Sequence, residues 1–168
     1  MATRLYTAYN GAMPTTAAPA KVTTGTVIKT LQQLSTSATG ALEVIEWGIS
    51  FDGSAAATPG ACELVSTAAV AATVTAYVAN DITALSGAAN RLATGLTLGT
   101  ANSGYTASAE GTTTQTRMGD FQLLPPTAPY IKQFPLERGF ELFASEFLRV
   151  RVTFGTAINA LCYIVWAE

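Results

Sequence analysis

The residues best suited to chemistry are charged side chains gathered near the carboxyl-terminal end. Three are acidic and three are basic: Glu137, Glu141 and Glu146, with Arg138, Arg149 and Arg151. Two carboxyl groups that flank one bond can hydrolyse it, as in glycosidases. Arginine also forms paired hydrogen bonds with carboxylates at surfaces and subunit interfaces. We interpret the cluster as an ion-pair network, and hydrolysis by Glu141 and Glu146 stays as a lesser alternative.

A second pair of carboxylates, Glu43 and Glu46, is separated by three positions. In a regular strand, residues three apart lie on opposite faces, so this spacing does not allow the two groups to act on one bond. Histidine is absent, which removes the commonest general base and metal ligand. We therefore expect no enzyme activity, no cofactor and no metal site. The two cysteines, Cys62 and Cys162, are too few for a zinc site and are predicted to be buried free thiols rather than a disulfide.

Composition limits the possible partners. Only 12% of the 168 residues are charged, about half of the usual ~25%. The nine Lys and Arg against eleven Asp and Glu exclude a strongly basic nucleic-acid binder. The longest weakly polar stretch, 67–80, is shorter than the ~20 residues of a membrane span. We expect neither a nucleic acid nor a membrane as partner.

The elements that must position these residues are short strands. In 42–51, Ile45, Trp47, Ile49 and Phe51 recur every second residue, which predicts one face of a strand. Further strands are predicted where β-branched or aromatic residues are bounded by Gly, Pro, Asn or Asp: 21–31, 62–66, 93–98, 111–124, 130–134, 141–143, 147–154 and 158–166. The stretch 67–80 is interpreted as strand or extended loop. The pattern predicts an all-β fold, a jelly-roll-like β-sandwich over residues 21–168.

The last two strands are the most regular. In 147–154, apolar residues alternate with Arg149, Arg151 and Thr153, as in a half-buried antiparallel strand. The final strand, 158–166, is apolar on both faces. Such a strand is either central in a sheet packed on both sides or part of a subunit interface.

Residues 1–20 are small, interrupted by proline and without hydrophobic periodicity. We interpret them as an extended N-terminal arm that contacts neighbouring subunits. The predicted capsid or subunit interface combines residues of this arm with the polar face of the strand 147–154: Arg4, Tyr6, Tyr9, Pro14, Pro19, Arg149 and Arg151.

Aromatic residues offer a different possibility. A platform for stacking sugars would draw on the tryptophans and most of the tyrosines, namely Trp47, Tyr77, Tyr105, Tyr130, Tyr163 and Trp166. Packing in the core or at an interface is the commoner role of such residues, and we favour it here.

The surface of the folded chain is expected to favour association. Alanine and threonine together make up one third of the chain, with 30 and 26 residues. Few charges are left to repel a second copy. Threonine is stiff and can hydrogen-bond, so a threonine-rich sheet face forms contacts at small entropic cost. This composition is typical of a coat or fibre component.

Several segments resemble a group of small structural proteins of tailed bacteriophages. They cover most of 42–168 and consist of strand patterns and short turns: Trp47–Gly53, Ser103–Thr112, Tyr130–Leu136, Phe147–Thr153 and Tyr163–Trp166. The resemblance implies a β-sandwich that adds to the phage head, either as a decoration protein or as another minor virion component. The first twenty residues lie outside it.

Together these observations lead us to expect a virion structural protein on the outer surface of the capsid. It would bind the major capsid protein and form a homo-oligomer, with a trimer favoured. The alternative is a tail or fibre-associated adhesin that binds a host-surface glycan through aromatic and threonine-lined surfaces.

Overall fold

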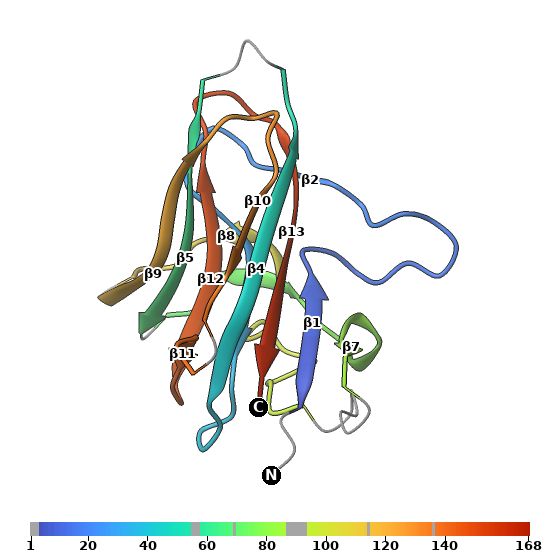
Figure 1. The fold of residues 1–168 in the computed structure, drawn as a ribbon, viewed down its shortest axis with the longest axis vertical. Coiled ribbons are helices and arrows are strands. Elements are labelled where there is room, and N and C mark those ends of the chain that lie inside the picture. The colour runs from blue at the N-terminus through green and yellow to red at the C-terminus, as the bar shows by residue number, and fades with distance from the viewer. Residues whose placement is uncertain (1–3, 55–57, 69, 87–93, 114, 136) are drawn as a thin grey trace.

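The chain folds into two antiparallel sheets packed face to face, shown in Figure 1. The computed structural model describes residues 4–54, 58–68, 70–86, 94–113, 115–135 and 137–168. This confirms the predicted all-β sandwich, while the jelly-roll topology stays a prediction. Within these ranges, no helix is long and apolar enough to cross a membrane.

The first sheet contains the first and the last strand of the chain. Its strands follow the order β10 (Tyr130–Gln133), β4 (Leu42–Asp52), β13 (Asn159–Ala167), β1 (Leu5–Tyr9) and β7 (Thr83–Ala84). Two further strands pair with this sheet: β11 (Phe140–Leu142) with β4, and β2 (Val22–Thr23) with β13.

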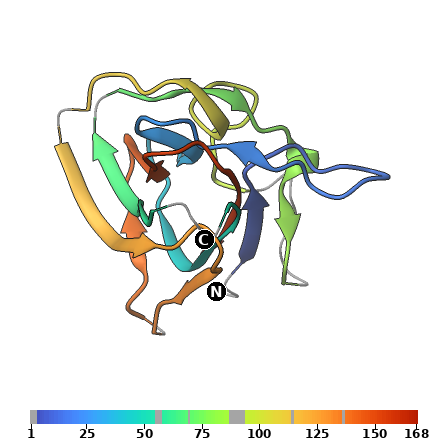
Figure 2. The same ribbon diagram turned by 90° about the horizontal axis from the view of Figure 1, so that it is seen from above.

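The second sheet lies behind the first, as the view from above shows (Figure 2). Its order is β6 (Thr73–Ala76), β8 (Gly104–Ala109), β3 (Lys29–Ser35), β12 (Glu146–Thr153), β5 (Gly60–Ala68) and β9 (Gln115–Leu124). A 3-10 turn, η1 (Ala79–Asp81), follows β6. The predicted strand 93–98 is wrong where it is described, because only Leu96 there forms a bridge, to Thr36.

The final strand, β13, is central in its sheet and has two different faces. Its inner residues alternate along the strand and belong to the buried core: Ala160, Cys162, Ile164 and Trp166. The outer residues Leu161, Tyr163 and Val165 are half-buried. The strand that is apolar on both faces is therefore central in its sheet. Its inner face is buried, and its outer face is only partly covered.

The core is built around two fully buried tryptophans, Trp47 and Trp166. The ring of Tyr6 stacks on Trp166 with centroids 5.7 Å apart, and the ring of Tyr130 meets Trp47 edge-on at 5.5 Å. Aromatic contacts of this kind add to the stabilisation from burial. The preferred interpretation of these tryptophans as packing residues is therefore confirmed.

A bulge in β4 corrects the predicted placement of two carboxylates. The register against β13 shifts so that Val165 faces Glu46 but Trp166 faces Val44. A bulge inserts one extra residue and reverses the alternation beyond it. Glu43 and Glu46 therefore lie on the same outer face, and not on opposite faces as a regular strand would place them.

The predicted boundary of the N-terminal arm also differs from the structure. Leu5–Tyr9 forms β1, which pairs with β13 on one side and with β7 on the other. Tyr6 and Ala8 are fully buried in the core. Five alternating residues are too few to show periodicity in sequence, so this strand was not predicted. Only the segment after Tyr9 extends away from the sandwich.

Both cysteines are buried and free, as predicted. Cys62 and Cys162 lie in different sheets, and both belong to the core. Burial, together with the charge of neighbouring Glu63, raises the pKa of Cys62 to about 12. Both thiols therefore stay protonated and unreactive at neutral pH.

We expect Trp166→Ala to lower the free energy of unfolding by about 3–5 kcal/mol, because it opens a large cavity at the centre of the core. Urea denaturation measures the change. Leu123→Ala serves as control at a largely exposed position and is expected to change the value by less than about 0.5 kcal/mol. A loss below about 1 kcal/mol for Trp166→Ala would show that this side chain does not organise the core.

Candidate functional site

A candidate binding surface is a groove on the outer face of the first sheet, which we call the outer groove. One row of paired residues crosses four strands there: Ile131 faces Gly48, Gly48 faces Tyr163, and Tyr163 faces Tyr9. The rings of Tyr9 and Tyr163 lie 5.8 Å apart. The groove has a volume of about 240 Å3 and eight lining residues: Tyr9, Ile49, Ser50, Pro129, Tyr130, Ile131, Leu161 and Tyr163.

Gly48 allows the ring of Tyr163 to lie flat across β4. A Cβ atom at this position would collide with that ring. The hydroxyl group of Tyr163 donates a hydrogen bond to the carboxylate of Glu46. Burial, and then this carboxylate, raise the pKa of Tyr163 well above its ordinary value. The ring is therefore fixed in place, and its hydroxyl group already donates its proton to a hydrogen bond within the chain.

A second of the three tyrosine hydroxyls of the outer groove is also occupied. Tyr130 donates to Asp120 at 2.7 Å, and Asp120 accepts a further bond from the indole nitrogen of Trp47 at 3.2 Å. Burial, followed by the hydrogen bond to Asp120, raises the pKa of Tyr130 to about 12. With two of its three tyrosine hydroxyls already donating and no charged residue in its lining, the groove suits an uncharged, largely apolar segment.

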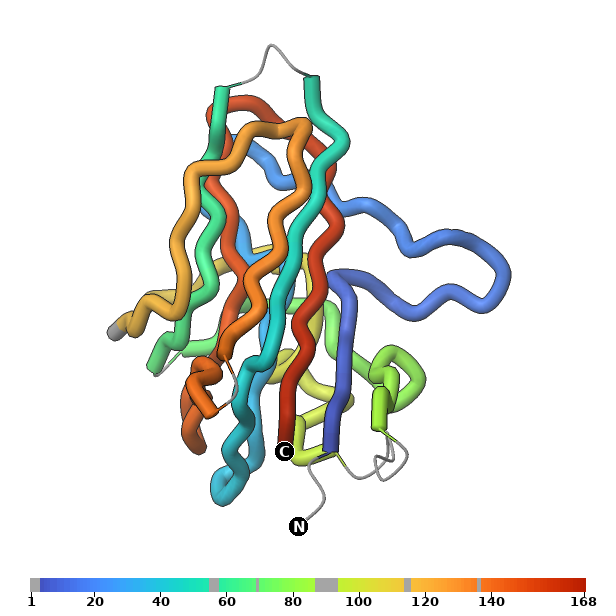
Figure 3. The backbone as a smooth tube through the Cα atoms, in the orientation of Figure 1, coloured from blue at the N-terminus to red at the C-terminus, as the bar shows by residue number. Residues whose placement is uncertain are grey.

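Beside this face, residues 11–21 form a projecting segment that we call the N-terminal loop (Figure 3). Its ends are fixed to the sandwich. At the first end, the amide of Asn10 donates to the carbonyl of Cys162, and the Asn10 side chain accepts from the Cys162 amide, both at 3.0 Å. The Met13 amide donates to buried Asp81 at 2.9 Å. At the other end, Lys21 forms an ion pair with Asp52.

The tip of the N-terminal loop does not pack on its own sandwich. Thr15, Thr16, Ala17 and Ala18 are all exposed, and residues 11–20 contain no charge. The two ends of the loop are thus bound to the sandwich, while its tip is exposed to solvent. This arrangement is typical of a segment that contacts another molecule.

A second apolar surface follows the edge of the second sheet. Strand β9 is the last strand of that sheet, and three of its side chains are strongly exposed: Met118 at 51%, Phe121 at 45% and Leu123 at 67%. Their cross-strand partners include Val65, Glu63 and Ala61. An edge strand with exposed large apolar residues is a common site of association. Sequence reasoning missed this surface because the exposed residues precede a double proline and read as the end of a buried strand.

Arg149, one of the predicted interface residues, is buried within its own chain. Its Nη1 donates to the carbonyl of Glu110 at 3.0 Å, and its Nη2 donates to the carbonyl of Val70. The Glu110 carboxylate lies 3.8 Å away and also accepts from the amide and hydroxyl of Thr30. The guanidinium therefore holds the segments around Val70 and Glu110 onto the outer face of the second sheet.

The other ion pairs also differ from the predicted cluster. Arg151 binds Glu63 at 2.9 Å, and Glu146 binds Arg117 at 2.7 Å. The partners are far apart in sequence but close in the second sheet: Arg151 and Glu63 lie on the adjacent strands β12 and β5, and Glu146 of β12 reaches Arg117 of β9 across β5. Charged pairs do form, but the cluster does not pair internally in the way that its spacing predicted.

The predicted interface residues of the arm lie in different environments. Tyr6 is in the core and Arg4 is exposed at the start of β1. Tyr9 lines the outer groove, while Pro14 and Pro19 belong to the N-terminal loop and are half-buried. The structure thus brings only Tyr9, Pro14 and Pro19 to surfaces suited to contact, and their role at an interface stays a prediction.

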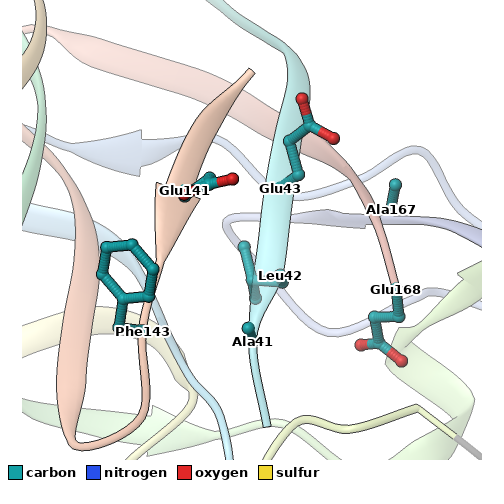
Figure 4. Close-up of a pocket in the computed structure, with 7 residues that line it drawn as sticks. All are labelled: Ala41, Leu42, Glu43, Glu141, Phe143, Ala167 and Glu168. Atoms are coloured by element: carbon teal, nitrogen blue, oxygen red, sulfur yellow. The ribbon is translucent and has the colours of Figure 1, made fainter. Parts of the chain in front are cut away.

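The glutamates have structural roles. Figure 4 shows Glu43, Glu141 and Glu168 around a cavity of about 340 Å3. Glu43 accepts from the Gly139 amide at 2.7 Å. Glu168 accepts from the Gly95 amide at 2.7 Å and from the indole nitrogen of Trp166 at 2.9 Å. These bonds fix loops and a strand end, and in the described ranges no three acidic or cysteine side chains are placed to hold a metal ion.

Comparison with known proteins adds little. No family model matches the sequence, and no curated protein is significantly similar to it. Among solved structures, the comparison finds the VP2 protein of infectious bursal disease virus, with 12% identity and a TM-score of 0.24. The match covers 99% of this chain but 39% of the VP2 chain. We draw no conclusion from so weak a likeness.

We expect Arg149→Met to lower the free energy of unfolding by about 2–4 kcal/mol, because the carbonyls of Val70 and Glu110 lose their donor and the Glu110 carboxylate loses its positive neighbour. Chemical denaturation measures this. Lys21→Met, which removes an exposed ion pair, is the matched control and should leave stability unchanged within error. Equal effects of the two substitutions would contradict the role assigned to Arg149.

We expect Glu146→Gln to destabilise the protein at pH 7 and to have little effect in acid. Burial acts to raise the pKa of Glu146, but hydrogen bonds from Arg117, Ser66 and the Phe143 amide outweigh it and lower the pKa below its ordinary value of 4.5. The stabilisation is therefore complete above 4.5 and disappears as the pH falls through the lower folded-state value. Melting temperatures from pH 7 to pH 3 test this, and a gap that stays constant in acid would refute it.

Proposed function

We propose that the protein is a bacteriophage virion structural protein: a capsid decoration protein that binds the assembled major capsid protein lattice on the outer capsid surface. The observation that carries the proposal is the exposed apolar row of β9. Met118, Phe121 and Leu123 are about half or more exposed along one edge strand, in a chain with only 12% charged residues. A surface of this kind is stabilised when a partner covers it.

A lattice is a suitable partner for such a row. Three apolar side chains bury a modest area, which gives one copy a modest affinity. When copies are joined to one another and bind a repeating surface, their contacts add through effective concentration. We therefore propose a homo-oligomer, with a trimer favoured, that is held to the lattice by β9 and stabilises the capsid against internal pressure.

The sandwich supports this role because it presents the contact rigidly. Asp120, next to the apolar row, accepts hydrogen bonds from Trp47 and Tyr130 of the first sheet. These bonds tie the edge strand β9 to the opposite sheet. A preorganised surface loses less conformational entropy when it binds.

The alternative, a tail or fibre-associated adhesin for a host-surface glycan, would use the outer groove. The half-buried pair Tyr9 and Tyr163 offers aromatic surface there. Sugar recognition also needs polar groups that are free to bind hydroxyls. Two of the three tyrosine hydroxyls of the groove, those of Tyr130 and Tyr163, already donate to Asp120 and Glu46. Trp47 and Trp166 are fully buried and offer no stacking surface. We therefore place this alternative second.

We expect Leu123→Glu combined with Phe121→Glu to weaken binding to capsids by about tenfold or more, because each substitution places a charge in an apolar contact. The assay is co-sedimentation with capsids prepared without this chain, from the bacteriophage that encodes it. Val27→Glu is the matched control, since Val27 is 71% exposed and lies outside β9. Unchanged binding by the double variant would contradict the assignment of β9.

Quantitative gels of purified particles test the location. A decoration protein is present in hundreds of copies per particle, about one for each repeating unit of the lattice. A handful of copies would favour the tail adhesin instead. Absence from purified particles would contradict a virion protein of either kind.

A further inference from the structure

The outer groove and the N-terminal loop have matching chemistry. The groove is lined by tyrosine, leucine, isoleucine and proline side chains without a charge. Residues 11–20 of the loop are also uncharged and contain Pro14 and Pro19. Aromatic-lined grooves commonly bind proline-containing segments, because the proline ring packs on aromatic faces and the segment is already restricted in conformation.

The loop is prepared for binding by its own anchors. Hydrogen bonds from Asn10 and Met13 fix the end that leaves β1, and the pairing of β2 with β13 fixes the end that returns to the sandwich. Much of the ordering that a free peptide would undergo on binding has therefore already occurred.

The loop does not bind the groove of its own molecule. It extends sideways from the end of β1, away from the sandwich (Figures 1 and 3). Its tip, residues 15–18, is exposed throughout, while the groove lies on the face formed by β10, β4, β13 and β1. The loop that could fill this groove is thus the loop of another molecule.

We propose that the outer groove receives the N-terminal loop of a second copy of this chain. Each copy then gives one loop and accepts one, so the contact joins two different surfaces. Such contacts close either reciprocally in a pair or head to tail in a ring. The inference rests on the proposed role of residues 11–20 as a subunit contact and names its receptor, but it does not involve β9 or the capsid.

The test uses two complementary variants of the full chain. Ile131→Asp places a charge in the groove at a side chain that is 63% exposed. Ala17→Glu with Ala18→Glu places charges at the exposed loop tip. Light scattering coupled to size-exclusion chromatography measures mass against concentration. Wild type is expected to associate, and either variant is expected to associate about tenfold or more weakly, because a buried unpaired charge opposes the contact.

Mixing the two variants gives the decisive result. The Ile131→Asp copy keeps a normal loop, and the Ala17→Glu/Ala18→Glu copy keeps a normal groove. One contact remains possible between them, so the mixture is expected to form a one-to-one complex that cannot grow further. Unchanged melting temperatures show that both variants are folded. Val27→Asp, at another exposed apolar position, is the control and should associate like wild type.

Three outcomes would overturn the inference: a wild type that stays monomeric at every concentration, a loop variant that associates normally, or two weakened variants that do not combine. The last result would indicate that grooves meet each other directly. The association assay contains no capsid, so a negative result there does not bear on the β9 contact. In the same way, a negative result in the capsid co-sedimentation assay does not bear on the loop contact.

Discussion

The pairing of β13 with its neighbours is the constraint on which the rest of the structure depends. Its inner face supplies Cys162, Ile164 and Trp166 to the core, and its ladders hold β4 on one side and β1 on the other. The same strand pairs with β2, and so it fixes both strands from which the N-terminal loop extends. Its outer face provides Leu161 and Tyr163 to the groove. One strand therefore determines the core, the loop and the groove together.

A few buried polar groups position segments that apolar packing alone would leave free. Arg149 holds the covering segments to the second sheet, and Asp120 joins β9 to the opposite sheet. Asp81 accepts from the base of the N-terminal loop. A buried charge is tolerated only when it is paired or hydrogen-bonded. In a chain with so few charges, these three side chains bind other parts of the same molecule. The exposed surfaces are consequently left apolar or weakly polar.

Sequence reasoning succeeded where periodicity is long and regular. The alternation around Leu148 and Val150 and the apolar run ending at Trp166 predicted β12 and β13 and, with them, the all-β sandwich. It failed where the pairing between strands changes what the local sequence pattern predicts. The bulge in β4 depends on register with β13, so the common face of Glu43 and Glu46 was not visible in spacing alone. The partners of Arg149 and Arg151 come from strands far away in sequence.

The candidate surfaces could be predicted only in part. A proline-containing segment without charges pointed to a contact arm, and Pro14 and Pro19 do lie in the N-terminal loop. The outer groove could not be predicted, because it arises from a row across four strands in which Gly48 makes room for Tyr163. The exposure of Phe121 and Leu123 likewise follows from the place of β9 at the edge of its sheet.

The central claim is that the charge-poor surfaces of this sandwich are covered by partners, and that the N-terminal loop and the outer groove are covered by other copies of the chain. Hydrogen–deuterium exchange of the amides in residues 11–20, measured from dilute to concentrated protein, tests it most directly. The account predicts that these amides, and those of the groove strands, become more protected as concentration rises. Exchange of the loop at one constant fast rate at every concentration would contradict it.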